Sequence, residues 1–124
     1  MNSGAVSIRN PRRGDILRAL LSPMEGSEQS GERPVLVLSP DLINEHSTII
    51  IVAALTSRKT DRIYPFEALI EAPEGGLTLD SKVMLLHIRS MDKRRVTGYY
   101  GQVGEEAMAR VDEALRIATG LTPV

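Results

Sequence analysis

The run Ile49-Ile50-Ile51-Val52-Ala53-Ala54-Leu55 is the strongest strand signal in the chain, and together with Thr48 it predicts a strand over residues 48–55. β-Branched side chains dominate its first half and favour extended structure. Both faces of this strand are apolar, as expected where a helix or a partner subunit covers one side of a sheet. The run therefore predicts a buried central strand, and a homodimer is a reasonable expectation.

Shorter runs on either side of the central strand predict further strands. They span residues 16–21, 34–38, 64–70, 82–88 and 94–100. Segments containing glycine or proline separate them, which is typical of strands joined by turns. Residues 41–46 form either a connection or a helical turn, and the polar, basic residues 56–63 predict a loop.

The C-terminal part of the chain changes to helical periodicity and predicts a helix over residues 105–119. Its apolar positions are Ala107, Met108, Val111, Leu115 and Ala118, which share one face. Gly120 occupies the position expected just after a helix end. Asp112 and Arg116 have the spacing of an i,i+4 ion pair. The pattern predicts a mainly β fold, a compact antiparallel sheet with one packed C-terminal helix.

Composition indicates one ordinary globular domain. The chain has 124 residues, of which 42% are hydrophobic and 25% charged. No apolar stretch approaches the roughly 20 residues that a membrane span needs, and residues 1–13 lack the apolar core of a signal peptide. There is no cysteine, which excludes disulfides, thiol nucleophiles and thiolate metal sites. The expected location is cytoplasmic, with no membrane partner.

Charge is balanced overall but uneven along the chain. The net charge is −1, yet residues 1–18, 51–66 and 81–98 are each net positive and alternate with acidic blocks. Folding can gather the basic blocks into one patch for an RNA backbone, or leave them on a mixed, solvated surface. On charge alone, the mixed surface is the favoured interpretation.

Several kinds of catalytic site lack support in the sequence. The two histidines, His46 and His87, show no metal-ligand spacing with other residues, and no phosphate-binding glycine loop or nucleophile elbow is present. With one Phe, three Tyr and no Trp, a base-stacking platform of the RRM type is not expected. The sequence therefore predicts no metal and no cofactor.

Several motifs nevertheless resemble the MazF/PemK toxin family. They are Arg13-Gly14-Asp15-Ile16, Gly26-Ser27-Glu28-Gln29, Arg33-Pro34-Val35-Leu36-Val37, Thr56-Ser57 and Asp92-Lys93-Arg94-Arg95. The resemblance covers about residues 12 to 120, which predicts a single MazF/PemK-like domain at 12–120. Residues 1–11 would then be a flexible N-terminal extension and residues 121–124 a tail.

The resemblance implies both a fold and an activity. The family fold is an SH3-like small barrel, a curved antiparallel sheet with a C-terminal helix, and its members form homodimers. They are the toxins of type II toxin–antitoxin pairs and cut single-stranded RNA at short motifs without a metal, through attack of the ribose 2′-OH. A cognate antitoxin neutralises them by laying a flexible, acidic C-terminal segment in the RNA groove.

The same resemblance assigns candidate catalytic residues. Arg33 matches the catalytic arginine, although a surface arginine paired with Glu28 or Glu32 is the ordinary alternative. Thr56 matches a catalytic or phosphate-orienting threonine, whose alternative is a strand-end hydroxyl bonded to its own turn. Glu28 either orients Arg33, shares in proton transfer, or only structures its loop.

A second group is expected to bind RNA. It comprises Arg13, Ser27, Gln29, Ser57, His87 and Arg89. His87 is a departure, because many relatives have glutamine there. A histidine titrates near neutral pH, so it alters sequence preference, joins the acid–base chemistry, or is simply a satisfied histidine at the end of a strand.

Two other functions remain as alternatives. The same barrel is used by a toxin that binds and poisons DNA gyrase without nuclease activity, and a degenerate homologue would only bind the antitoxin. The joint presence of Arg33 and Thr56 argues against both.

Overall fold

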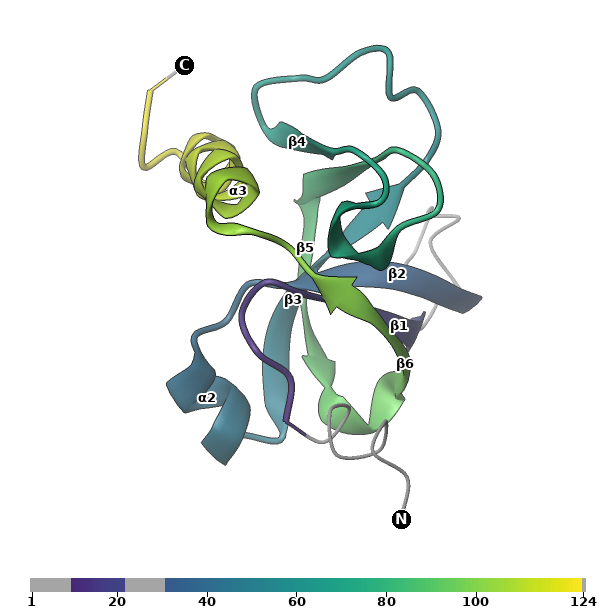
Figure 1. Cartoon of the computed structure of the whole chain (residues 1–124). Coiled ribbons are helices and arrows are strands. Elements are labelled where there is room, and N and C mark those ends of the chain that lie inside the picture. Colours follow the sequence, from purple (N-terminus) through teal and green to yellow (C-terminus); the bar gives the residue numbers. More distant parts are fainter. Residues whose placement is uncertain (1–9, 22–30, 124) are drawn as a thin grey trace.

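The computed structural model describes residues 10–21 and 31–123. One six-stranded antiparallel sheet, in the order β4-β5-β3-β2-β1-β6, dominates this part of the chain (Figure 1). The strands are β1 (Asp15–Leu21), β2 (Gly31–Val37), β3 (Ile49–Thr56), β4 (Glu67–Ile70), β5 (Ser81–Asp92) and β6 (Val96–Gln102). The helices are α2 (Asp41–His46), α3 (Glu105–Ala118) and the short 3₁₀ turns η1 (Glu74–Gly76) and η2 (Lys93–Arg95). The mainly β fold with a C-terminal helix is confirmed.

The predicted strands are present, with shifted ends. β2 starts at Gly31, three residues before its prediction, and β5 continues to Asp92. β4 starts only at Glu67 because the preceding residues form a turn, in which the Glu67 N–H donates to the Tyr64 carbonyl at 2.8 Å. Of the two possibilities for residues 41–46, the helical one is correct.

The sheet is curved but open. β4 and β6 lie at its two edges, so the SH3-like barrel is incompletely closed. Register shifts interrupt the β1–β6 pairing, and another falls between Ala53 and Leu55 in the β3–β5 pairing. Irregularities of this kind bend a strand and increase its twist, and they therefore contribute to the curvature of the sheet.

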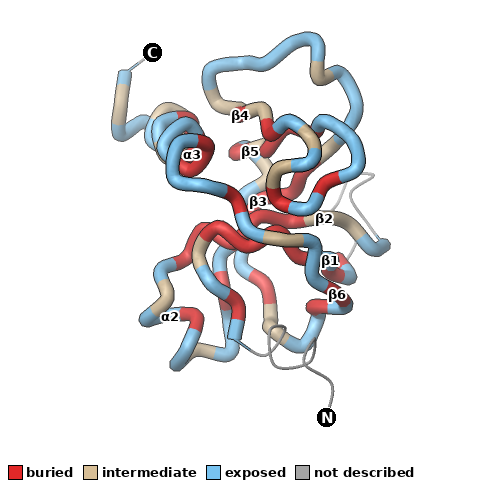
Figure 2. The backbone as a smooth tube through the Cα atoms, viewed as in Figure 1, coloured by how far each residue is buried: buried red, intermediate tan, exposed pale blue. Residues whose placement is uncertain are grey.

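Each face of the sheet carries a core cluster of buried apolar residues. Figure 2 shows that buried residues concentrate in the strands. Strand alternation separates the two clusters: Ile16, Leu36 and Ala53 belong to one cluster, while their neighbours Leu17, Val35 and Val52 belong to the other. α3 covers the first cluster with one apolar face, formed by Ala107, Met108, Val111 and Ala114. Among the described helices, none is long and apolar enough to span a membrane.

The end of α3 follows its prediction, but one ion pair does not. Gly120 has φ +81°, and the N–H groups of Gly120 and Leu121 donate to the carbonyls of Ile117 and Arg116, as in a Schellman motif. The predicted pair between Asp112 and Arg116 is wrong. Asp112 instead pairs with Arg13, and Arg116 pairs with Glu113 one turn earlier.

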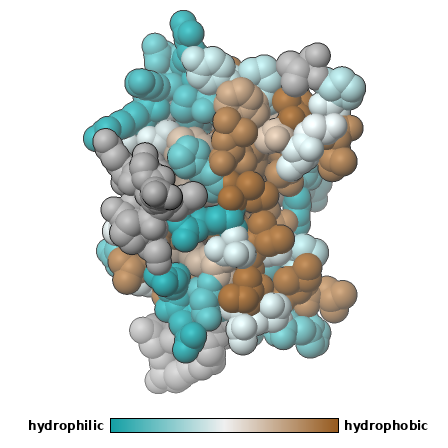
Figure 3. Space-filling model, turned by 180° about the vertical axis from the view of Figure 1, so that it is seen from behind, coloured by the Kyte–Doolittle hydropathy of each residue, from teal (hydrophilic) through white to brown (hydrophobic). Residues whose placement is uncertain are grey.

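Part of the sheet remains uncovered. Ile49, Ile51 and Ile88 lie on the same face as Ala53, as the β3–β5 register shows, but beyond the area that α3 covers, and all three are exposed. Leu86 on β5 is exposed as well. Figure 3, which views the molecule from behind, shows a band of hydrophobic side chains along its length.

Candidate active site at the ends of β2 and β3

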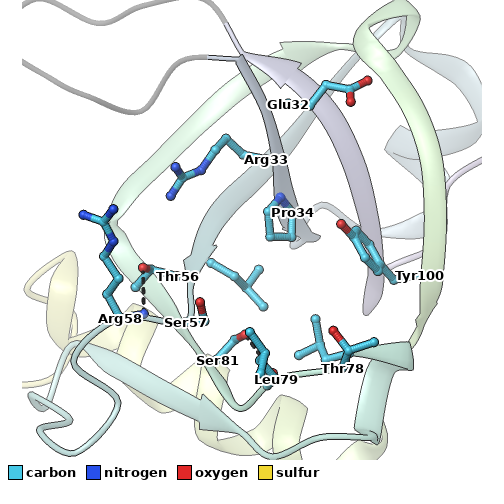
Figure 4. Close-up of a pocket in the computed structure, with 12 residues that line it drawn as sticks. Glu32, Arg33, Pro34, Thr56, Ser57, Arg58, Thr78, Leu79, Ser81 and Tyr100 are labelled. Atoms are coloured by element: carbon cyan, nitrogen blue, oxygen red, sulfur yellow. Dashed lines mark hydrogen bonds between the residues drawn. The ribbon is translucent and has the colours of Figure 1, made fainter.

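A pocket of about 300 Å³ lies where the start of β2 meets the end of β3. Twelve residues line it: Glu32, Arg33, Pro34, Leu55, Thr56, Ser57, Arg58, Leu77, Thr78, Leu79, Ser81 and Tyr100. Figure 4 shows the side chains of Arg33 and Arg58 on one side of the pocket, near Thr56 and Ser57. Tyr100 lies on the other side, and Pro34 lies between Arg33 and Tyr100.

The antiparallel register explains why Arg33 and Thr56 come together. Val35 pairs with Ala54, and continuing this register by two residues places Arg33 opposite Thr56. Helix α2 and most of β3 lie between these two residues along the chain, whereas in the sheet they lie on neighbouring strands. The two main catalytic candidates therefore share one pocket.

Arg33 carries an unsatisfied group. Its Nε is buried and has no hydrogen-bond partner in the part of the chain that the structure describes. Of the two expected alternatives, the pair with Glu32 is not found, and the Glu32 carboxylate lies 3.8 Å from Arg18 Nε instead. The pair with Glu28 falls outside the described residues. A buried donor without a partner is costly and is uncommon in folded proteins. Arg33 thus lines the pocket with a guanidinium group whose Nε donor is unsatisfied.

Thr56 closes a small turn at the end of β3. Its Oγ1 accepts a hydrogen bond from the backbone N–H of Arg58 at 3.1 Å. This is the strand-end hydrogen bond that the sequence offers as the alternative to a catalytic role. The two are compatible, because a hydroxyl that accepts one bond still has its own proton to donate. The same turn brings Arg58 to the pocket, a residue that the sequence analysis did not single out.

A buried ion pair holds the 57–63 loop against the sheet. Lys82, opposite Thr56 on β5, donates from Nζ to the Glu67 carboxylate and to the Arg62 carbonyl, both at 2.9 Å. The Lys82 and Glu67 side chains are only 6% and 11% exposed. The loop that carries Arg58 is therefore anchored at its far end.

A close backbone crossing fixes the opposite wall. A Cβ on Gly76 would lie 2.0 Å from the Tyr100 carbonyl oxygen, and the φ of Gly76 is +75°. Only glycine allows η1 to pack this closely on β6. Leu77, Thr78 and Leu79 follow directly and line the same pocket. The position of Tyr100 depends on this crossing, which no local sequence signal indicates.

The other predicted site residues lie elsewhere. Ser27, Glu28 and Gln29 fall outside the described residues. Arg13 is half-buried and contacts three other segments: its side chain pairs with Asp112 and donates to the Leu38 carbonyl, and its backbone N–H donates to Asp41. His87 and Arg89 are half-buried on β5 and do not line this pocket. Of the predicted RNA-binding residues that the structure describes, only Ser57 lies beside Arg33 and Thr56.

Among the described residues, one of the basic segments lies away from the pocket. The η2 segment Lys93–Arg95 follows Asp92, which pairs with Ile49 at the opposite end of β3 from Thr56. The mixed-surface interpretation fits this arrangement. Within residues 10–21 and 31–123, no group of three or more His, Asp and Glu side chains is placed to hold a metal ion.

Asp15 is the one buried carboxyl whose pKa departs clearly from normal in this part of the chain. Burial raises the pKa of Asp15 above its usual 3.8, although the N–H of Arg12 and the amide of Gln102 donate to the carboxylate and oppose the shift. Asp15 does not line the Arg33 pocket. Its titration therefore bears on stability rather than on that site.

Comparisons with known proteins cover almost the whole chain. The model of the PemK-like, MazF-like toxins of type II toxin–antitoxin systems matches residues 12–119. Endoribonuclease EndoA of Bacillus subtilis (strain 168) is 43% identical over 110 residues, which is 89% of this chain and 95% of that protein. The crystal structure of MazF (Form-I) from Deinococcus radiodurans is 32% identical with a TM-score of 0.75, over 89% of this chain and 96% of that one. MazE-MazF (Form-II) from the same organism gives 30% identity and a TM-score of 0.71, over 91% and 98%.

Proposed function

Because the chain belongs to the PemK-like, MazF-like toxin family of type II toxin–antitoxin systems, we propose that it cuts single-stranded RNA at a short motif without a metal. In this proposal, Arg33 and Thr56 bind the phosphate being cut. The chain's similarity to an endoribonuclease at 43% identity supports the activity. The observation that carries the site assignment is the buried, unpartnered Nε of Arg33 beside Thr56.

The reaction uses the RNA's own ribose as nucleophile. The 2′-oxygen forms a bond to the adjacent phosphorus, and the bond from phosphorus to the 5′-oxygen breaks. A base takes the 2′ proton and an acid gives a proton to the 5′-oxygen. The products are a 2′,3′-cyclic phosphate and a 5′-hydroxyl, so DNA, which lacks the 2′-OH, is not cut.

Arg33 and Thr56 suit the stabilisation of the phosphorane-like transition state. A guanidinium group binds two phosphate oxygens in a planar fork and stays charged at any working pH. The Thr56 hydroxyl can donate its own proton to one of the non-bridging phosphate oxygens while Oγ1 accepts from Arg58 N–H. The Arg58 side chain adds a second positive charge at the rim. Glu28 stays a prediction for the proton-transfer step.

The chain is also proposed to act as a homodimer with an antitoxin partner. The exposed Ile49, Ile51 and Ile88 give β3 and β5 an apolar area that a second copy would cover. Relatives crystallised as MazE-MazF support an antitoxin partner. An acidic antitoxin segment would find two arginines in the pocket. The expected compartment is the cytoplasm, where mRNA is translated.

The test is cleavage of long single-stranded RNA in EDTA, with cut ends mapped by primer extension. The wild type is expected to cut at one recurring motif and to leave 5′-hydroxyl ends. Arg33→Ala should lower the rate at least about 100-fold, as expected for removal of a transition-state donor. Arg116→Ala, which alters an exposed arginine on α3, is the matched control and should cut normally.

Two results would overturn the proposal. One is cutting by Arg33→Ala at the wild-type rate. The other is cutting of an oligonucleotide that carries a 2′-deoxy sugar at the mapped position. If no RNA is cut by a folded wild type, the gyrase-binding alternative becomes the one to test.

A further inference from the structure

The wall of the pocket opposite the arginines has a different chemistry. Arg33, Arg58 and Thr56 gather on one side, whereas Tyr100 lies on the other, with Pro34 between them (Figure 4). Leu79, which is exposed, lies at the edge. One side thus fits an anion and the other a flat, weakly polar group. A nucleotide combines both within one residue.

Tyr100 is free to make such a contact. It is 37% exposed, and its hydroxyl forms no hydrogen bond within the described part of the chain. The Phe66 ring stacks instead on Tyr64, with ring centres 5.5 Å apart, so both of those aromatic rings are already engaged. Tyr99, the next residue on β6, does not line this pocket. Tyr100 is therefore the aromatic side chain of the Arg33 pocket.

The backbone that carries the ring is held in place before any ligand binds. The Gly76 backbone contacts the Tyr100 carbonyl, and a Cβ on Gly101 would lie 2.8 Å from the Gly75 carbonyl carbon. These contacts fix the backbone on both sides of the Tyr100 side chain. A fixed backbone does not have to be ordered when a ligand binds, which favours affinity.

We propose that Tyr100 stacks on the base of a nucleotide that flanks the phosphate held by Arg33 and Thr56. This inference rests on the proposed function, and it makes Tyr100 a substrate-binding residue of the same site. Stacking of a base on one aromatic side chain accepts any base to some extent. Tyr100 therefore supplies affinity and positioning, and the neighbouring polar groups select the base. A single stacking residue differs from the multi-aromatic platform that the composition excludes.

The experiment measures binding to an uncleavable oligonucleotide by fluorescence anisotropy. The probe carries the mapped motif with a 2′-deoxy sugar at the cut position. Tyr100→Leu is expected to weaken binding between about 5-fold and about 100-fold, the range for loss of one base–aromatic stack. Tyr100→Phe keeps the ring and should bind within about 3-fold of wild type. Tyr99→Leu is the matched control and should bind normally.

Two further probes replace the base on either side of the cut position by an abasic sugar. Wild-type protein should bind one of these probes as weakly as Tyr100→Leu binds the intact probe, and on that probe Tyr100→Leu should have no further effect. The loss of wild-type binding on one abasic probe can be measured without the variant, so this part of the test holds even if Tyr100→Leu folds poorly.

The proposal is overturned if wild type binds both abasic probes as tightly as the intact one, or if Tyr100→Leu weakens binding equally on all probes. If either result is found while cleavage still depends on Arg33, only the role of Tyr100 is refuted. Loss of Arg33 dependence would refute the proposed function instead.

Discussion

At the scale of single residues, Lys82 shows how a buried charge organises the surroundings of the pocket. Its ammonium group contacts Glu67, the Arg62 carbonyl and, at 5.7 Å, the Tyr64 ring. Buried pairs add little net stability compared with apolar residues, but breaking one partner leaves the other charge uncompensated. The pair therefore fixes the loop more than it stabilises the fold.

We expect Lys82→Met and Glu67→Gln each to lower the free energy of unfolding by about 3 kcal/mol. The double variant should lose less than the sum of the two, because it leaves no unpaired charge. Urea denaturation measures all three. Arg116→Met, which breaks the exposed pair with Glu113, should change the value by less than about 0.5 kcal/mol. Strict additivity of the two buried substitutions would contradict this account.

Asp15 makes a pH prediction with a defined sign. Its folded-state pKa is raised, so between its usual value of 3.8 and the folded value the native state binds more protons than the unfolded state. Stability from this group is therefore present at low pH and is lost as pH rises through the folded pKa. Asp15→Asn should remove this loss while Gln102, with its amide turned, keeps a hydrogen bond.

The measurement for Asp15 is the unfolding free energy of both proteins at several pH values from about 3 upward. The difference between Asp15→Asn and wild type should shift in favour of the variant as pH rises. A constant difference over that range would show that Asp15 titrates normally.

The sequence predicted part of the pocket at this scale. Arg33, Thr56 and Ser57 follow from the family motifs and meet in the structure. Arg58 and Tyr100 were not predicted, because their place depends on a turn and on a backbone crossing rather than on a motif. Arg13 matched a motif, yet its side chain pairs with α3, 99 residues further along the chain.

At the scale of elements, the contact of η1 with β6 determines the shape of the pocket. The sequence predicted a turn at Pro73–Gly76 from its glycines and proline, and a turn is present there. It did not predict that this turn packs on another strand, since that contact is between residues 24 positions apart. Helix α3, by contrast, was predicted almost to the residue, because its periodicity and its Gly120 cap are local signals.

Gly76→Ala tests the crossing. We expect it to lower the free energy of unfolding by at least about 2 kcal/mol, because a Cβ adds a backbone clash to an unfavourable positive φ. Gly120→Ala has a similar φ of +81° but nothing within 4 Å, and should cost about 1 kcal/mol. Thermal denaturation compares the two. Equal losses would mean that the crossing adjusts without strain.

At the scale of the whole molecule, the uncovered apolar face is the feature that a single copy leaves unexplained. The sequence indicated that β3 is apolar on both faces and that a helix or a partner covers one side. In the structure, α3 covers this face of β3 only in its second half, at Ala53 and Leu55. In the first half of the strand, Ile49 and Ile51 stay exposed. Sequence alone could not locate this division, because it depends on where α3 docks.

If a second copy covers this face, the wild type should sediment as a dimer at micromolar concentration. Ile51→Lys puts a charge in the middle of the area and should shift the protein to monomer, with its circular dichroism spectrum unchanged. Leu121→Lys is the control, because Leu121 is more exposed but lies beyond α3. A monomeric wild type would refute the dimer and leave the face to another partner.

The order of the elements along the chain has a consequence for synthesis. A ribosome completes all six strands before it reaches α3, yet α3 supplies the cover for Leu36 and Leu55 on the two strands that carry Arg33 and Thr56. A chain that stops before residue 105 would expose that cluster, and we expect it not to hold the two strands in the arrangement proposed for the site. Only the full-length protein, released after translation, would then be able to cleave mRNA.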